Sequence, residues 1–118
     1  MPASNEEKEF TSYVVELMQS LGLVRAKAMF GGYGIFLDGL MFGLVADSVL
    51  YLKADKETEK EFQARGLEPF TYRKKGKEFK ISYYQAPEEA LEDDEEMTSW
   101  AAQAYSIAVQ AASKKRKK

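Results

Sequence analysis

The stretch Met29 to Lys53, MFGGYGIFLDGLMFGLVADSVLYLK, decides the fold of this chain. It contains three short apolar runs, which the dipeptides Asp38-Gly39 and Asp47-Ser48 separate. Asp-Gly between apolar runs is typical of a two-residue β-hairpin turn. The stretch therefore predicts a three-stranded antiparallel meander as the nucleus of the fold.

Two-residue turns also predict which residues of this meander face each other. The first turn pairs Leu37 with Leu40, and regular pairing then adds Phe36 with Met41, Ile35 with Phe42, Gly34 with Gly43, and Tyr33 with Leu44. The second turn sets Val45 beside Leu50 and Gly43 beside Leu52. In this register Leu44 shares a face with Ile35, and Val45 lies on the other face. Both faces are then apolar or aromatic.

A sheet that is apolar on both sides needs cover on both sides, because large exposed apolar patches usually mark interaction sites. We expect homodimerisation through the uncovered part, and the alternative is that three helices are distributed over both faces. Facing glycines would leave a shallow depression for a helix or partner, unless they mark bulge or bend positions. The candidate partner or packing surface comprises Tyr33, Gly34, Phe36, Met41, Gly43 and Tyr51.

Helix signals flank the meander on both sides. A first helix is expected at about 5 to 21, with a capping box at Ser4 and Glu7. A middle helix should follow the N-cap Asp55 and run over 56–65, and a long one should run over about 94–113. The apolar stripe of the long helix comprises Met97, Trp100, Ala101, Ala104, Ile107, Ala108 and Ala111.

Two further segments are predicted to form β-strands. These are residues 23–30 and a hairpin over 67–84 with the basic tip Lys74-Lys75-Gly76-Lys77. The predicted fold is α+β, a two-layer α/β sandwich with a mainly antiparallel sheet of about five to six strands. Residues 1–112 should form the one domain, and residues 113–118 a basic, disordered tail.

The composition narrows the possible chemistry. The chain of 118 residues has no cysteine and no histidine, so it lacks thiol chemistry and the commonest general base and zinc ligand. The run Phe30 to Gly34 lacks the Lys-Ser/Thr of a phosphate-binding loop. The acidic segment 88–96 is better explained as capping of the next helix, with Asp93 as its N-cap, than as a metal site. We expect no enzyme, no catalytic residue, no cofactor and no metal. No apolar run nears the ~20 residues of a membrane span, so we expect a cytoplasmic protein without membrane contact.

Basic residues gather at two places, although the net charge is −2. All 19 acidic residues precede the basic C-terminus. Either the hairpin cluster or the C-terminal cluster could contact phosphates. The alternative for the hairpin is a charged turn that prevents edge strands from pairing with other chains, and the alternative for the C-terminus is a solvated tail. The candidate nucleic-acid contacts are Arg73, Lys74, Lys75, Lys77, Lys114, Lys115, Arg116, Lys117 and Lys118.

Several ordered motifs resemble the N-terminal domain of the TfoX/Sxy family. They are MFGGYGI at 29–35, DGLMF at 38–42, LYLK at 50–53, PFTY at 69–72, SYY at 82–84 and APEE at 86–89. The resemblance covers about residues 5 to 112. It implies a two-layer α/β domain and a role in the regulation of bacterial competence, where longer members resemble coactivators that work with the cAMP receptor protein at promoters. It implies no catalytic residues.

The longer regulators have a second, C-terminal domain, whereas this chain ends in Lys-Lys-Arg-Lys-Lys. We therefore expect a non-enzymatic protein-interaction domain, homodimeric and with a transcription regulator as a possible further partner. The alternative is an accessory protein that binds DNA weakly and without sequence preference through its basic tail.

Overall fold

The computed structural model describes residues 5–29 and 31–116. Six strands form one antiparallel sheet in the order β1-β2-β3-β4-β6-β5. The strands are β1 (Arg25–Met29), β2 (Gly32–Leu37), β3 (Leu40–Ala46), β4 (Val49–Lys53), β5 (Pro69–Lys74) and β6 (Lys77–Gln85). The helices are α1 (Asn5–Leu17), α2 (Lys56–Ala64) and α3 (Asp94–Arg116), with short 3₁₀ helices η1 (Gln19–Leu21) and η2 (Glu88–Leu91). The predicted α+β class is confirmed.

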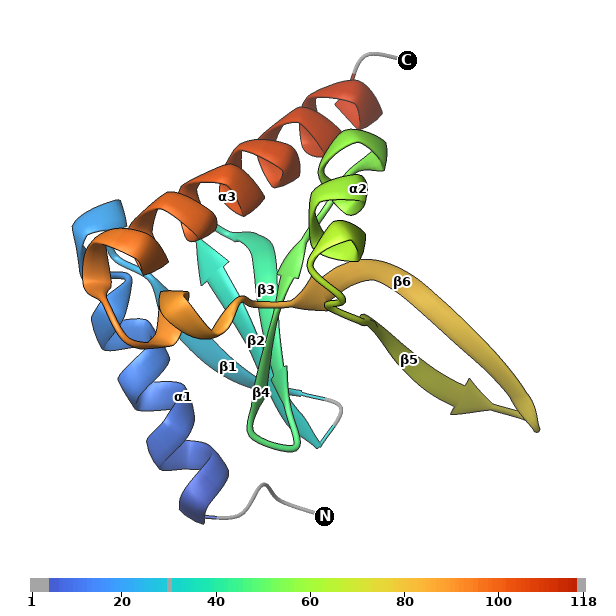
Figure 1. Cartoon of the computed structure of the whole chain (residues 1–118), viewed down its shortest axis with the longest axis horizontal. Helices are drawn as coiled ribbons and strands as arrows, with labels where there is room; N and C mark the ends of the chain where they lie inside the picture. The colour runs from blue at the N-terminus through green and yellow to red at the C-terminus, as the bar shows by residue number, and fades with distance from the viewer. Residues whose placement is uncertain (1–4, 30, 117–118) are drawn as a thin grey trace.

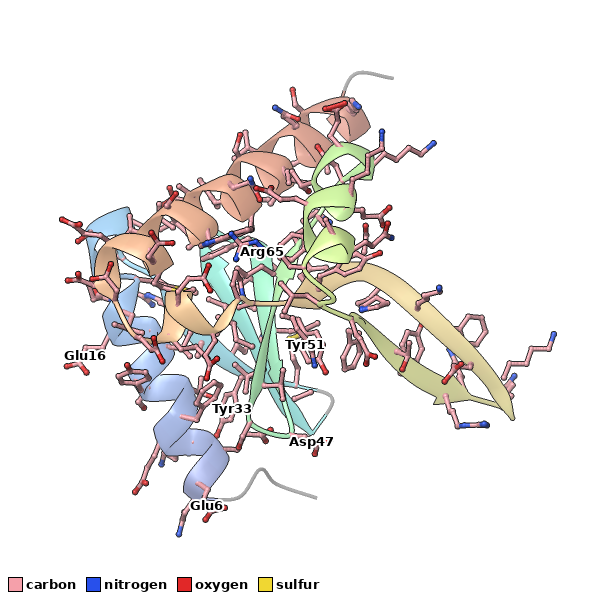
Figure 2. All side chains as sticks on the ribbon, in the orientation of Figure 1. Glu6, Glu16, Tyr33, Asp47, Tyr51 and Arg65 are labelled. Atoms are coloured by element: carbon pink, nitrogen blue, oxygen red, sulfur yellow. The ribbon has the colours of Figure 1, made fainter. Side chains whose placement is uncertain are left out.

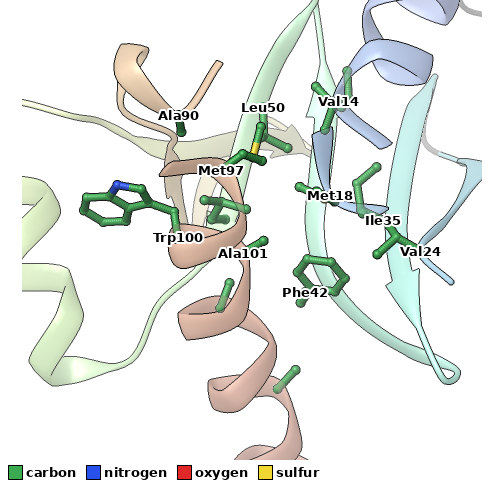
Figure 3. Close-up of a cluster of buried hydrophobic side chains, with 14 of the residues drawn as sticks. Val14, Met18, Val24, Ile35, Phe42, Leu50, Ala90, Met97, Trp100 and Ala101 are labelled. Carbon is green, nitrogen blue, oxygen red and sulfur yellow. The ribbon is translucent and has the colours of Figure 1, made fainter. Parts of the chain in front are cut away.

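All three helices pack on one face of the sheet (Figure 1). Val14 of α1, Phe62 of α2 and Ala101 of α3 belong to one buried apolar cluster. The sheet supplies its other half from alternate positions of β2 and β4, as expected for strands with one buried face, and from Phe42 and Val45 of β3 and Tyr84 of β6. Figure 3 shows Val14, Phe42 and Ala101 of this cluster between the sheet and the helices. The alternative of helices on both faces is therefore wrong.

The meander forms with both predicted turns but with a different register. Leu37 faces Leu40 and Phe36 faces Met41 as predicted. Beyond them the pairing shifts by one residue, so that Ile35 faces Gly43. Phe42 is the extra residue of a β-bulge, in which two residues of one strand oppose one of the other.

The bulge exchanges the faces of everything that follows it on β3. Gly34 now faces Leu44 and Tyr33 faces Val45, so the predicted pairs Ile35–Phe42, Gly34–Gly43 and Tyr33–Leu44 are wrong. The pairs across the second turn, Val45 with Leu50 and Gly43 with Leu52, are confirmed. Val45 therefore joins Ile35 on the helix-covered face, and Leu44 moves to the opposite one.

Helix α1 ends earlier than the sequence indicates. It stops at Leu17, and the separate 3₁₀ helix η1 continues the chain to Leu21. Met18, which directly follows α1, is fully buried, as is Val14. Ser4 of the expected capping box lies outside the described residues. Glu7 is buried, and its Oε2 accepts a hydrogen bond of 3.1 Å from the Ser48 backbone N–H, which ties α1 to the β3–β4 turn.

Helix α2 begins with the predicted cap. Asp55 Oδ1 accepts hydrogen bonds from the backbone N–H groups of Glu57 and Thr58, at 3.1 and 2.8 Å. The Thr58 hydroxyl accepts one from the Asp55 N–H at 3.0 Å, which completes a capping box. Phe62 anchors the helix by stacking on Tyr84 with ring centroids 5.4 Å apart.

We predict that Asp55→Ala lowers the free energy of unfolding by about 1 kcal/mol at neutral pH. The hydrogen bond from the Thr58 N–H is the main cause of a pKa of Asp55 below its usual value. A lowered pKa means that the stabilisation is present above the unfolded value of about 3.9 and is lost as the pH falls below it. Urea unfolding at neutral and acid pH checks this, with Lys60→Ala as the control. An equal deficit at both pH values would contradict the carboxylate's role.

Helix α3 follows the predicted stripe and exceeds its predicted end. Glu96 N–H donates to Asp93 Oδ2 at 3.2 Å, so Asp93 caps the helix as expected. The stripe is buried as far as Ala108, whereas Ala111 is exposed. The helix continues to Arg116, so residues 113 to 116 extend it instead of forming a separate tail. Lys117 and Lys118 lie outside the described residues.

Candidate functional site

The second face of the sheet carries no helix in the part of the chain that the structure describes, and we call it the open face. Gly34, Phe36, Met41 and Tyr51 from the predicted partner surface lie on it, as the observed register requires. The other two predicted residues do not. Tyr33 packs against the helix-covered core, and the bulge places Gly43 opposite the buried Ile35.

Gly34 is the centre of a tightly packed patch, not of an empty depression. A Cβ atom at Gly34 would lie 2.6 Å from Met29 Sδ, 2.8 Å from Phe36 Cε1 and 3.2 Å from Met41 Sδ. These three side chains therefore fill the space that the missing Cβ leaves. The alternative interpretation of a bulge holds for Gly43, which directly follows the extra residue Phe42.

A groove of about 680 Å³ lies on the open face, between the meander and the β5–β6 hairpin. Figure 2 shows Tyr51 on β4, the strand of the meander that pairs with β6 of this hairpin. The groove is formed by segments far apart in the sequence. Tyr33 borders it as well, although it also packs against the helix-covered core. The groove is lined by Met29, Gly32, Tyr33, Met41, Leu44, Val45, Ala46, Phe70, Tyr72, Arg73, Lys74 and Ile81.

A row of aromatic rings leads from the open face out along the hairpin. Tyr51 meets Phe70 edge to face with centroids 5.2 Å apart. Phe70 stacks on Tyr72 at 6.3 Å, and Tyr72 stacks on Phe79 at 5.5 Å. Sequence reasoning did not include the last three rings in the candidate surface. The alternation of Phe70 with Tyr72 and of Phe79 with Ile81 was the signal that placed them on one face.

The two predicted basic clusters lie apart. Arg73 and Lys74 line the groove, Lys75 lies in the hairpin turn, and Lys77 is the first residue of β6. Lys114 is exposed near the end of α3, which points away from the hairpin tip (Figure 1). The side chains of residues 115 to 118 lie outside the described part. Within it, the one ion pair joins Arg65 and Glu89 at 2.5 Å, so the hairpin cations form none.

Tyr83, on the open face, has a largely buried side chain with a polar hydroxyl group. Only 8% of it is exposed, its hydroxyl donates to the Met41 carbonyl at 3.4 Å, and Lys53 Nζ lies 5.2 Å from its ring centre. Burial raises the pKa of Tyr83 to about 12. Burial also contributes most to the raised pKa of Tyr51.

We predict that this burial makes the protein less stable at alkaline pH. The folded state holds the Tyr83 proton more tightly than the unfolded chain, whose tyrosine pKa is about 10. The stabilisation is therefore full below pH about 10 and is lost as the pH rises towards the folded value. Phenolate absorbance and urea unfolding, compared between the wild type and Tyr83→Phe, check this. Identical alkaline titrations of the two proteins would contradict it.

The carboxylates do not converge on a metal site. Within residues 5–29 and 31–116, no three histidine, cysteine, aspartate or glutamate side chains form a group that could hold a metal ion. The acidic segment before α3 instead contributes the Asp93 cap. None of the described helices is both long enough and apolar enough to cross a membrane.

Comparison with known proteins places the chain in a family. Residues 16–108 match the TfoX N-terminal domain. The DNA transformation protein TfoX1 of Aliivibrio fischeri is 33% identical over 85 residues, which are 72% of this chain and 39% of that protein. Protein Sxy of Escherichia coli is 29% identical over 73 residues, 62% of this chain and 35% of that protein.

The chain therefore spans about two fifths or less of the length of these two relatives. The matched region contains the whole sheet, the middle helix α2 and most of α3. The family resemblance seen in the sequence motifs is thus confirmed. This chain belongs to the TfoX N-terminal domain family.

Proposed function

We propose that this chain is a non-enzymatic regulatory domain that acts in the control of DNA transformation by contacting another protein. The match of residues 16–108 to the TfoX N-terminal domain carries the proposal, since a similar protein is named for DNA transformation. Fold membership alone does not specify a function, so the contact must be argued from a surface. The open face supports such a contact, because no helix of the described part of the chain covers Phe36, Met41 and Tyr51.

A gene deletion tests this function in the bacterium that encodes the chain. We expect deletion to change the transformation frequency and the transcript levels of the DNA-uptake genes, and expression of the chain from a second site to restore both. An empty expression vector is the control. Unchanged transformation and unchanged transcripts after deletion would overturn the proposal.

DNA contact is the second candidate function, and the unpaired cations of the hairpin favour it. Arg73, Lys74, Lys75 and Lys77 all lie at or beside one turn and make no ion pair within the described residues. Such contacts give an affinity that falls steeply with salt. DNA binding at increasing salt, for the full chain and for one ending at Ser113, measures how much of the affinity the basic C-terminal residues 114–118 contribute. Absence of binding at low salt would exclude this candidate.

The homodimer expected from the sequence stays a prediction. Sedimentation at tens of micromolar tests it, because a monomer has a mass of 13.4 kDa. A measured mass near that value would contradict it.

A further inference from the structure

The groove on the open face combines an apolar floor with a positively charged rim. Its floor comprises the side chains of Met29, Met41, Leu44, Phe70 and Ile81. The charged residues that line it are Arg73 and Lys74, and no acidic residue lines it in the described part of the chain. The chain as a whole has a net charge of −2. The groove is therefore a local basic site on an acidic protein.

The groove continues into exposed aromatic surface. Tyr72 and Phe79 are each 41% exposed and stack on each other across β5 and β6. They lie outside the buried core cluster. Met29 and Met41 add flexible thioether side chains, which adapt readily to the shape of a binding partner.

We propose that this groove binds a short acidic segment of another protein that also carries apolar side chains. The apolar side chains of the segment would be buried against Met41, Leu44 and Phe70. Removing this apolar surface from water would stabilise the complex. The carboxylates would pair with Arg73 and Lys74 at the rim. This inference rests on the proposed protein-interaction function and specifies the chemistry of the partner.

The composition of the groove favours a peptide over nucleic acid. Bases bind to single-strand sites by stacking on free aromatic faces. Here the floor is mainly aliphatic and thioether, and Phe70, Tyr72 and Phe79 stack on one another. Two lining cations can also neutralise only a few phosphates.

Charge favours a different chain over a second copy of this one. A two-fold dimer brings the same patch of both subunits together. Among the described residues, the charged groups that line this patch are cations, so two copies would set like charges close to each other. An acidic segment has the complementary charge.

The binding test uses a designed, fluorescein-labelled peptide in which leucines recur at helical spacing and glutamates fill most other positions. One control peptide carries lysines in place of the glutamates, and another carries serines in place of the leucines. Fluorescence anisotropy with the full chain measures affinity, and amide NMR spectra locate the site. We expect binding of the acidic peptide alone, with shifts centred on Met41, Leu44 and Tyr72.

Two matched pairs of variants separate the groove from general surface effects. Arg73→Glu with Lys74→Glu is expected to weaken binding by about tenfold or more. Lys56→Glu with Lys60→Glu makes the same change in net charge on exposed positions of α2 and should leave affinity within about twofold. Tyr72→Ser should weaken binding, whereas Val109→Ser, at a position 42% exposed, should not.

Four results would overturn the inference. They are no binding of the acidic peptide, equal effects of the two charge reversals, tighter groove-dependent binding of an oligo-dT strand, and a dimer that Tyr72→Ser dissociates. Complementation of the deletion strain separates the two proposals. If the wild type and the Arg73→Glu, Lys74→Glu chain both restore transformation, the groove inference fails and the proposed function stands. If the wild type restores nothing, the proposed function fails whatever the peptide does.

Discussion

Replacing Phe42 with alanine is expected to lower the free energy of unfolding by about 3–5 kcal/mol. Phe42 is fully buried and meets Tyr105 of α3 edge to face, with ring centroids 5.7 Å apart. As the extra residue of the bulge, it fills the space between β3 and the helices. Truncation would remove that apolar contact and leave a cavity that the rigid sheet cannot close.

Urea unfolding of the wild type and of Phe42→Ala measures this loss. Phe79→Ala is the matched control, because Phe79 is 41% exposed on the projecting hairpin. Its loss should be well below that of Phe42→Ala. Equal losses for the two variants would show that Phe42 does not have the role that its burial indicates.

Replacing Gly32 with alanine is expected to cost about 3 kcal/mol, the upper end of the range for overpacking. A Cβ atom there would lie 2.1 Å from the Val45 carbonyl oxygen and 3.3 Å from the Val45 carbonyl carbon. These are backbone atoms of the neighbouring strand, so no side-chain rotation can relieve the clash. β2 and β3 must separate locally, at the edge of the groove.

Gly39→Ala distinguishes this clash from backbone strain. Gly39 has a φ of +79° and no atom within 4 Å of its ideal Cβ position. Alanine there should cost about 1 kcal/mol for the left-handed backbone alone. Urea unfolding of both variants gives the comparison, and a smaller loss for Gly32→Ala than for Gly39→Ala would contradict the packing argument.

Local chemistry made much of the fold predictable. The dipeptide Asp38-Gly39 determined the first hairpin, since both residues take positive φ values in the turn. Asp55 and Asp93 marked two helix starts because a carboxylate can accept hydrogen bonds from free backbone N–H groups. Trp100 of the predicted apolar stripe is buried and packs against Phe62 of α2, with ring centroids 5.4 Å apart.

The bulge at Phe42 could not be predicted in the same way. A strand that is apolar on both faces gives no alternation from which a one-residue shift could be detected. The shift is stabilised by contacts distant in sequence, such as Phe42 against Tyr105. It moved Gly43 and Val45 to the helix-covered face and Leu44 to the open one, which changed the membership of the candidate surface.

Local sequence was sufficient to predict the main helices and strands, both meander turns, two helix caps and the family, because each depends on neighbouring residues or on ordered motifs. The packing of all three described helices on one face of the sheet became known from the three-dimensional arrangement. It alone joined Met29 and Met41 to Phe70 and Arg73 in one groove. Those residues meet through strand order and sheet shape, which arise from packing of the whole chain and not from any local pattern.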